Sequence, residues 1–163
     1  MKNLILKIIP IIAISLLFTE ITIAQDKHTI TLFVDTENVS MRNIESTCNF
    51  GQSSQISNEE FSIFVEKGDT VEWVGKSTSS EEDKVEIKLI EYSNGTNFFE
   101  TQKLRGSNGI VTAVVKVAEP GTYEKYNIEF KVFRNGKWVR ETFPIDPKLR
   151  VRSLSMSESV IID

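Results

Sequence analysis

The sequence is poor in histidine, cysteine and net positive charge. Its 163 residues include one histidine, His28, and one cysteine, Cys48. A single cysteine excludes a disulfide within the chain, and a single histidine disfavours a serine-histidine-aspartate triad. Acidic residues outnumber basic ones by 23 to 19, which gives a formal net charge of −4. Such a chain lacks the basic face that nucleic acids and anionic membranes require.

Long apolar runs are scarce beyond the N-terminus. Two lysines near the start precede an apolar run over residues 8–18, which is shorter than the roughly 20 residues that a membrane-spanning helix needs. Small side chains at Thr22 and Ala24 follow, as at a signal-peptidase site. The sequence therefore predicts a signal peptide over residues 1–24. It also predicts a secreted or periplasmic protein that keeps no integral membrane segment after cleavage.

The remaining residues, 25–163, are numerous enough for a single domain with its own hydrophobic core. Within this domain we interpret Cys48 as a small, buried, apolar side chain. An intermolecular disulfide and a catalytic thiol are the alternatives for this residue, in that order. His28 lies close to the predicted N-terminus of the domain, and nothing in the sequence places it near Cys48.

Alternating apolar and polar residues make most of this domain β-prone. The clearest stretch is Phe61–Val74, where two alternating segments flank the turn Lys67-Gly68-Asp69. A period of two residues indicates strands with one buried face. Glycine followed by aspartate is typical of turns, because glycine reaches positive φ without a Cβ clash.

Further strands are predicted on both sides of this stretch. The alternation of His28–Val34 indicates a first strand. The same pattern predicts later strands over residues 84–92, 98–104, 110–118, 122–133, 137–145 and 149–154, with turns at 93–97 and 106–109. Asn135-Gly136 favours a tight hairpin. The tail, 155–163, can add a short strand or fray.

Two segments have no strand pattern. Residues 35–58 are polar and hold isolated apolar anchors at Met41, Ile44 and Phe50, with a helical turn predicted within Ser40–Ser46. Long structured loops often carry function, although a plain crossover loop is the simpler interpretation. Residues 75–83 are predicted as a second polar loop.

These patterns predict an all-β fold, a Greek-key β-sandwich. Two motifs within it resemble the cupredoxin-like sandwich family. One is Val65–Trp73, a strand, a Lys-Gly-Asp turn and a strand with tryptophan near its end; the other is Val117–Tyr123, which contains Pro-Gly-Thr-Tyr. The resemblance spans roughly residues 61–130 and implies a cupredoxin-like scaffold. An immunoglobulin-like domain without its disulfide has the same strand count and is the alternative.

The resemblance does not extend to the copper ligands. A blue-copper site needs two imidazoles and a thiolate. The family's first histidine follows the tryptophan strand, where residues 74–83 contain none, and its Cys-His-Met cluster follows the Pro-Gly-Thr-Tyr turn, where residues 123–152 contain none of the three. The resemblance therefore implies a shared scaffold with no copper site, and we predict no metal and no cofactor.

The sequence favours a non-catalytic binding or structural protein at the cell envelope or outside the cell, with a protein as its partner. Edge strands are the expected contact surface, because their unpaired backbone groups can accept another strand. The alternative from a different class is an unusual metal-binding or redox protein that uses His28, Cys48 and a methionine. A small hydrolase with carboxylate chemistry is a third hypothesis. No pattern selects particular catalytic or binding residues.

Overall fold

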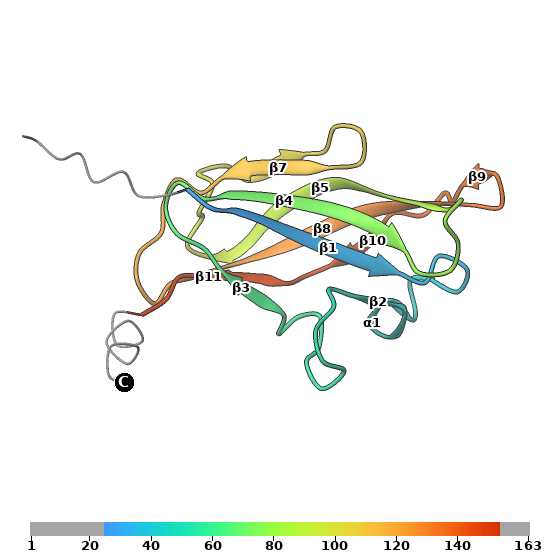
Figure 1. Cartoon of the computed structure of the whole chain (residues 1–163), viewed down its shortest axis with the longest axis horizontal. Helices are drawn as coiled ribbons and strands as arrows, with labels where there is room; N and C mark the ends of the chain where they lie inside the picture. The colour runs from blue at the N-terminus through green and yellow to red at the C-terminus, as the bar shows by residue number, and fades with distance from the viewer. Residues whose placement is uncertain (1–24, 154–163) are drawn as a thin grey trace, which may run out of the picture.

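The computed structural model describes residues 25–153 of the chain. The predicted signal peptide, 1–24, and the predicted tail strand, within 155–163, lie outside the described residues. The described part consists of two mixed β-sheets and one short helix (Figure 1). This confirms the all-β prediction. No helix within residues 25–153 is long and apolar enough to cross a membrane.

Eleven strands make up the two sheets of the described part. The first sheet contains, in spatial order, β2 (Cys48–Asn49), β1 (Lys27–Val34), β4 (Thr70–Ser77) and β7 (Val111–Val114). The second contains β3 (Ser62–Phe64), β11 (Lys148–Arg150), β8 (Tyr123–Arg134), β5 (Lys84–Gly95) and β6 (Lys103–Arg105), with β9 (Lys137–Trp138) and β10 (Phe143–Ile145) also paired to β8. The helix α1 spans Ile44–Thr47.

The two sheets form two layers whose buried faces meet (Figure 1). Trp73 of β4 and Tyr126 of β8 are both fully buried and join the layers at their centre. The Trp73 Nε1–H donates to the Tyr126 hydroxyl at 3.1 Å, and the two rings meet edge to face at 5.7 Å. An aromatic pair with its polar atoms satisfied in this way stabilises the centre of the core.

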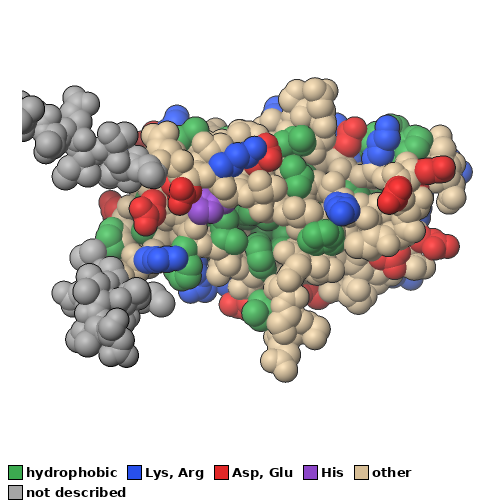
Figure 2. Space-filling view, viewed as in Figure 1, with side chains coloured by type: hydrophobic (Ala, Val, Ile, Leu, Met, Phe, Trp, Pro, Cys, Tyr) green, Lys and Arg blue, Asp and Glu red, His purple; other side chains and the backbone are tan. Residues whose placement is uncertain are grey.

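The period-two pattern correctly predicted the long strands. On β8 the inward residues Tyr126, Ile128, Phe130 and Val132 are all fully buried. The hairpin after β8 is also confirmed, because Asn135 and Gly136 both have positive φ, 52° and 73°. On the viewed side of the molecule, charged and hydrophobic side chains are interspersed without a large patch of one sign (Figure 2).

The pairing along the sheets is partly parallel. β1 runs parallel to β4 along all eight residues, and β11 runs parallel to β3. The predicted turn at Lys67–Asp69 is present, but the strands that flank it do not pair with each other. β3 belongs to the second sheet and β4 to the first, so this turn carries the chain from one layer to the other.

The structure corrects the boundaries around the second predicted loop. β4 continues through Ser77, so the loop predicted over 75–83 begins later. β5 continues through Gly95, so the turn predicted over 93–97 overlaps the end of a strand. The sequence pattern missed these extensions because the strand ends are polar. Their backbones pair with neighbouring strands although they have no buried apolar face.

The predicted strand over 98–104 is wrong in its first half. Phe98 and Phe99 lie in turns with both rings buried, and β6 covers only the last part of the segment. The Phe98 carbonyl accepts from the N–H groups of Lys116 and Val117 (2.7 and 3.1 Å). The first part of the segment thus turns around two buried rings, and only its end forms a ladder, with β5.

The C-terminal strands also differ from the prediction. The strand predicted over 137–145 is two short strands, β9 and β10, each paired to β8. The edge strand predicted over 149–154 is β11, which lies between β3 and β8 and is therefore internal. The strand predicted over 110–118 shortens to β7. The helical turn predicted within 40–46 corresponds to α1, shifted toward the C-terminus.

Candidate functional site

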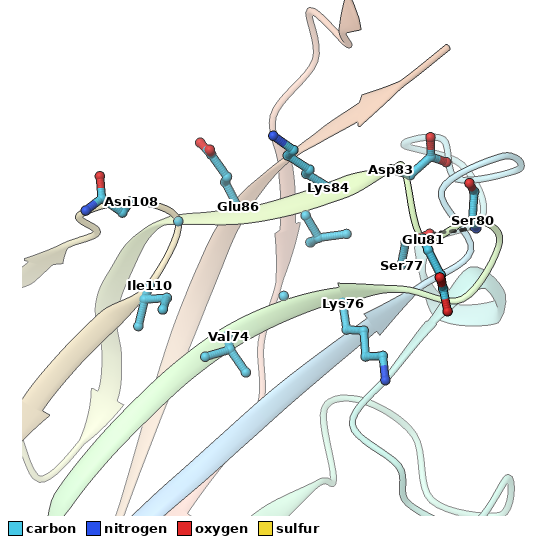
Figure 3. Close-up of a pocket in the computed structure, with 13 residues that line it drawn as sticks. Val74, Lys76, Ser77, Ser80, Glu81, Asp83, Lys84, Glu86, Asn108 and Ile110 are labelled. Atoms are coloured by element: carbon cyan, nitrogen blue, oxygen red, sulfur yellow. Dashed lines mark hydrogen bonds between the residues drawn. The ribbon is translucent and has the colours of Figure 1, made fainter. Parts of the chain in front are cut away.

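A hollow of about 490 Å³ opens between β4 and β5, where the two sheets meet along one side (Figure 3). Four segments wall it: the second half of β4, the loop that follows, the start of β5 and the turn before β7. The lining residues are Val74, Gly75, Lys76, Ser77, Ser80, Glu81, Asp83, Lys84, Val85, Glu86, Asn108, Gly109 and Ile110. We call this hollow the β4–β5 groove.

Only the first half of β4 has a strand on each side. β1 follows β4 along its whole length, whereas β7 pairs with Thr70–Trp73 alone. The second half, Val74–Ser77, has no strand on the β7 side among residues 25–153. It is therefore an open strand edge, the kind of surface to which another strand can add.

The backbone groups of this open edge point into the groove. On the β1 side the Thr78 N–H donates to the Val34 carbonyl, and on the β7 side the Val115 N–H donates to the Asp69 carbonyl, both at 2.8 Å. Successive residues of a strand direct their N–H and C=O groups to opposite neighbours. Gly75 lies six positions after Asp69, so its N–H and C=O point to the same side as those of Asp69, which at Gly75 is the open side.

The start of β5 forms the opposite wall. β6 pairs with β5 only at Leu89–Glu91, and the Ile87 N–H donates to the Gly109 carbonyl at 3.0 Å. Within the described part of the chain, Lys84–Glu86 therefore has a strand on its β8 side alone. The tight turn at Asn108 and Gly109, with φ of 53° and 80°, closes this end of the groove.

The two walls touch at Gly75. A Cβ placed there would overlap the Val85 Cγ1 and lie 2.6 Å from the Val85 carbonyl oxygen. Only glycine lets β4 pass this close to β5. A glycine inside a strand often marks a close backbone approach, and this was the one sequence signal that could have located the groove.

A buried threonine fixes the far end of the groove. Thr36 is fully buried, and its Oγ1 donates to the Asp83 Oδ2 (2.5 Å) and lies 2.8 Å from the Ser77 Oγ. The Arg134 guanidinium donates to the Thr36 carbonyl at 2.5 Å. These contacts hold the loop after β4 against the end of β1. They also give the groove a fixed shape.

The groove offers hydrogen bonding and apolar contact. Val74 and Ile110 face each other at one end (Figure 3). Two serine hydroxyls line the groove, and each accepts a backbone N–H. The Ser80 N–H donates to the Ser77 Oγ and the Glu82 N–H donates to the Ser80 Oγ, both at 3.2 Å. These hydroxyls shape the loop. The rest of the lining is the strand edge, which suits the backbone of an extended chain, and charged side chains of both signs: Lys76, Glu81, Asp83, Lys84 and Glu86.

His28 lies away from the groove, near the start of β1. Its Nε2 is 2.8 Å from the Asp69 Oδ2, which also accepts the Glu66 N–H at 2.8 Å. Burial raises the pKa of Asp69, but the hydrogen bonds from Glu66, His28 and the Asp26 N–H together hold it below its usual value. The histidine thus helps to close the turn that leads into β4.

Cys48 lies at the other end of β1, opposite Val34, whereas His28 lies opposite Val71. The structure therefore does not bring His28 and Cys48 together. Cys48 is buried in the core, as interpreted from the sequence. Burial raises the pKa of its thiol to about 12. Among residues 25–153 no group of three or more His, Cys, Asp or Glu side chains is placed to hold a metal ion.

The segment 35–58 is more ordered than its sequence suggested. Asn58 is buried, and its Nδ2 donates to the Cys48 carbonyl at 2.9 Å. The Asn58 N–H donates to the Glu45 Oε1 at 2.8 Å, and Gln52 donates to the Asn58 Oδ1 at 2.9 Å. The buried amide of Asn58 thus ties the end of the segment back to β2, which lies in its middle. Its sequence gave no signal for this role, because such an asparagine also fits a surface loop.

Comparison with known proteins gives a likeness of fold. No family model matches the sequence, and no curated protein matches it significantly. A solved structure, an inclusion body protein (PixA) from Burkholderia cenocepacia, is similar with a TM-score of 0.54. It is 13% identical in sequence, and the likeness covers 80% of this chain and 98% of that chain. At this identity the likeness concerns the fold alone.

Proposed function

We propose that this chain is a non-catalytic binding protein that accepts an extended segment of a partner protein in the β4–β5 groove. The observation that carries the proposal is the open edge of β4 at Val74–Ser77, which lies inside a walled hollow. A partner strand placed there continues the line of β7 and hydrogen-bonds to β4. Val74 and Ile110 supply apolar contact at the same place.

β7 is also an edge strand, and it is the competing surface. Val114 on β7 is 49% exposed and Ile110 in the groove is 41% exposed, so both offer apolar contact. The groove is favoured because walls on several sides bury more of a bound segment than a flat edge does.

We also propose a location at the cell envelope or outside the cell, and a Greek-key topology for the two sheets. The N-terminal segment 1–24 has the composition of a signal peptide, which supports a role at the cell envelope or outside the cell. The Lys-Gly-Asp turn before β4 and the Pro-Gly-Thr-Tyr segment before β8 support a Greek-key sandwich of cupredoxin-like outline. An immunoglobulin-like sandwich is the alternative topology.

The test starts from octapeptides selected from a random library against the full chain. Their affinity is then measured for the wild type and for Ile110→Lys, which puts a charge beside the open edge. We expect this change to weaken binding at least about tenfold, since it removes apolar contact and opposes strand addition.

Val114→Lys is the matched control, because it introduces the same charge at a similarly exposed position on β7. Binding to Val114→Lys should equal binding to the wild type. If Val114→Lys abolishes binding and Ile110→Lys does not, the partner strand adds to β7. If neither variant weakens binding, the peptide binds neither the open edge of β4 nor β7.

A further inference from the structure

A row of aromatic and cationic side chains crosses the outer face of the second sheet. Arg150 on β11 pairs in register with Phe64 on β3 and with Tyr123 on β8. Residues in register on neighbouring strands project from the same face of a sheet. Phe64 and Tyr123 are 41% and 42% exposed, so two aromatic rings flank one arginine in water.

Two arginines in this row keep their charge available. The lysines of the neighbouring row are neutralised, Lys148 by Glu60 at 2.8 Å and Lys125 by Glu59 and Asp146 at 2.6 and 3.0 Å. Arg150 has no carboxylate within ion-pair distance among residues 25–153. Arg152, also without such a partner there, lies over the Phe64 ring at 5.4 Å.

The tyrosine of the row is held in place by its backbone. The Thr96 N–H donates to the Tyr123 carbonyl at 2.8 Å. Gly95 has a φ of 89°, and a Cβ there would overlap the same carbonyl, so the end of β5 lies directly against Tyr123. The Tyr92 hydroxyl donates to the Gly95 carbonyl at 2.8 Å and fixes this approach. The backbone that carries the ring is thus fixed, and one edge of the ring lies close to Gly95.

A hollow of about 410 Å³ adjoins the row. Glu59, Asn94, Tyr123, Lys125, Lys148 and Arg150 line it. Its size is within the range of small-ligand sites. It therefore combines an aromatic face, an amide side chain and a guanidinium that has no carboxylate partner within residues 25–153, beside the ion-paired Glu59, Lys125 and Lys148.

We propose that this row and its hollow bind an acidic saccharide, a glycan whose rings carry carboxylates. The guanidinium of Arg150 can hold a carboxylate through two parallel hydrogen bonds. The exposed ring of Tyr123 offers a flat apolar face to the C–H face of a sugar ring, and its hydroxyl and Asn94 offer polar contacts to sugar hydroxyls. The other available arginine, Arg152, extends the positive charge for a second acidic ring.

A protein strand is a poorer fit to this surface. β11 pairs with β3 on one side and with β8 on the other, so its backbone groups are already used. A ligand on the sheet face therefore meets side chains alone, whereas strand addition needs a free edge. The site is separate from the β4–β5 groove and does not depend on the function proposed for it.

The test is calorimetric titration of the full chain with hexagalacturonate, an acidic oligosaccharide, and with maltohexaose, its neutral counterpart. We expect saturable binding of hexagalacturonate at about 1 mM or below, and at least tenfold weaker binding of maltohexaose. Arg150→Gln and Tyr123→Ala should each weaken hexagalacturonate binding by about tenfold or more, because each removes one of the two recognition elements.

Arg140→Gln and Trp138→Ala are the controls, since they remove an exposed arginine and an exposed aromatic ring elsewhere. Neither should change binding. Equal affinity for maltohexaose, no effect of Arg150→Gln, or no binding of hexagalacturonate overturns the proposal. Binding of a hexaglutamate peptide as tight as that of hexagalacturonate also overturns it, because the surface then recognises acidic peptides.

Discussion

At the residue scale, the least expected side chain in the core is a glutamate. Glu124 is 1% exposed, and its Oε2 accepts the Phe98 N–H at 2.5 Å. Burial raises the pKa of Glu124 to about 7, and the hydrogen bond from Phe98 offsets only part of that effect. The carboxyl therefore anchors the turn that carries Phe98. Burial favours its protonated form, whereas the hydrogen bond from Phe98 favours the ionised form.

Glu124 should make the protein less stable as the pH rises. An unfolded chain loses this proton near 4.5, whereas the folded chain keeps it until about 7. The free energy of unfolding should thus fall between these values, by up to about 3 kcal/mol. Glu124→Gln should remove this fall in the free energy of unfolding with pH. Denaturant unfolding of both proteins from pH 4.5 to 8 checks this, and parallel pH profiles would contradict it.

The hydrogen bond between Trp73 and Tyr126 should also contribute measurably. Tyr126→Phe leaves the buried Trp73 N–H without its acceptor, which should lower the free energy of unfolding by about 1–3 kcal/mol. Tyr92→Phe is the control, because Tyr92 bonds to Gly95 in a more exposed place. Chemical unfolding followed by tryptophan fluorescence compares the two. A larger loss for Tyr92→Phe would show that the core pair is not a main stabilising contact.

At the element scale, β4 is the strand on which the molecule depends most. It lies at the centre of the first sheet, brings Trp73 into the core and forms one wall of the groove. Its alternation predicted its first half, but the period-two pattern stops at Gly75. The glycine looks like the start of a loop in the sequence. In the structure it is the point where β4 passes β5.

Gly75→Ala should destabilise the protein by about 1–3 kcal/mol, because the new methyl group overlaps Val85 and the walls must separate. Val85→Ala removes the overlapping Cγ1 but leaves the carbonyl contact. In a double-mutant cycle, the two changes together should therefore cost less than the sum of each alone, by about 0.5 kcal/mol or more. Strict additivity, measured by denaturant unfolding, would show that the two strands are not in contact at Gly75.

The sequence pattern predicts a strand only where the strand is long enough and buries one of its faces. β8 buries one face along most of its length, and β1 and the first half of β5 do the same over shorter stretches, so the alternation of their side chains reveals them. Phe98 and Phe99 misled the prediction, because buried aromatic residues also anchor turns. β2 and β9 are too short for any period to appear.

At the scale of the whole molecule, the arrangement of the strands was beyond the sequence pattern. β3 and β11 pair in parallel although they lie far apart in the sequence, at 62–64 and 148–150, and β1 pairs in parallel with β4 across the whole 35–58 segment. Alternation shows which face of a strand is buried, but it carries no information about the neighbouring strand. The groove depends on where β7 and β6 end relative to their neighbours, which alternation does not show, so Gly75 was its one signal in the sequence.

The proposed function requires that the second half of β4 is an open edge that accepts a partner strand. Amide hydrogen exchange at Gly75 and Trp73, with and without a selected octapeptide, reports on this edge. In the free protein the Gly75 amide should exchange at least about a hundredfold faster than that of Trp73, which lies in the half paired with β7. The peptide should slow Gly75 markedly and leave Trp73 unchanged. A Gly75 amide as protected as that of Trp73 in the free monomer, or one that the peptide does not slow, would contradict the account.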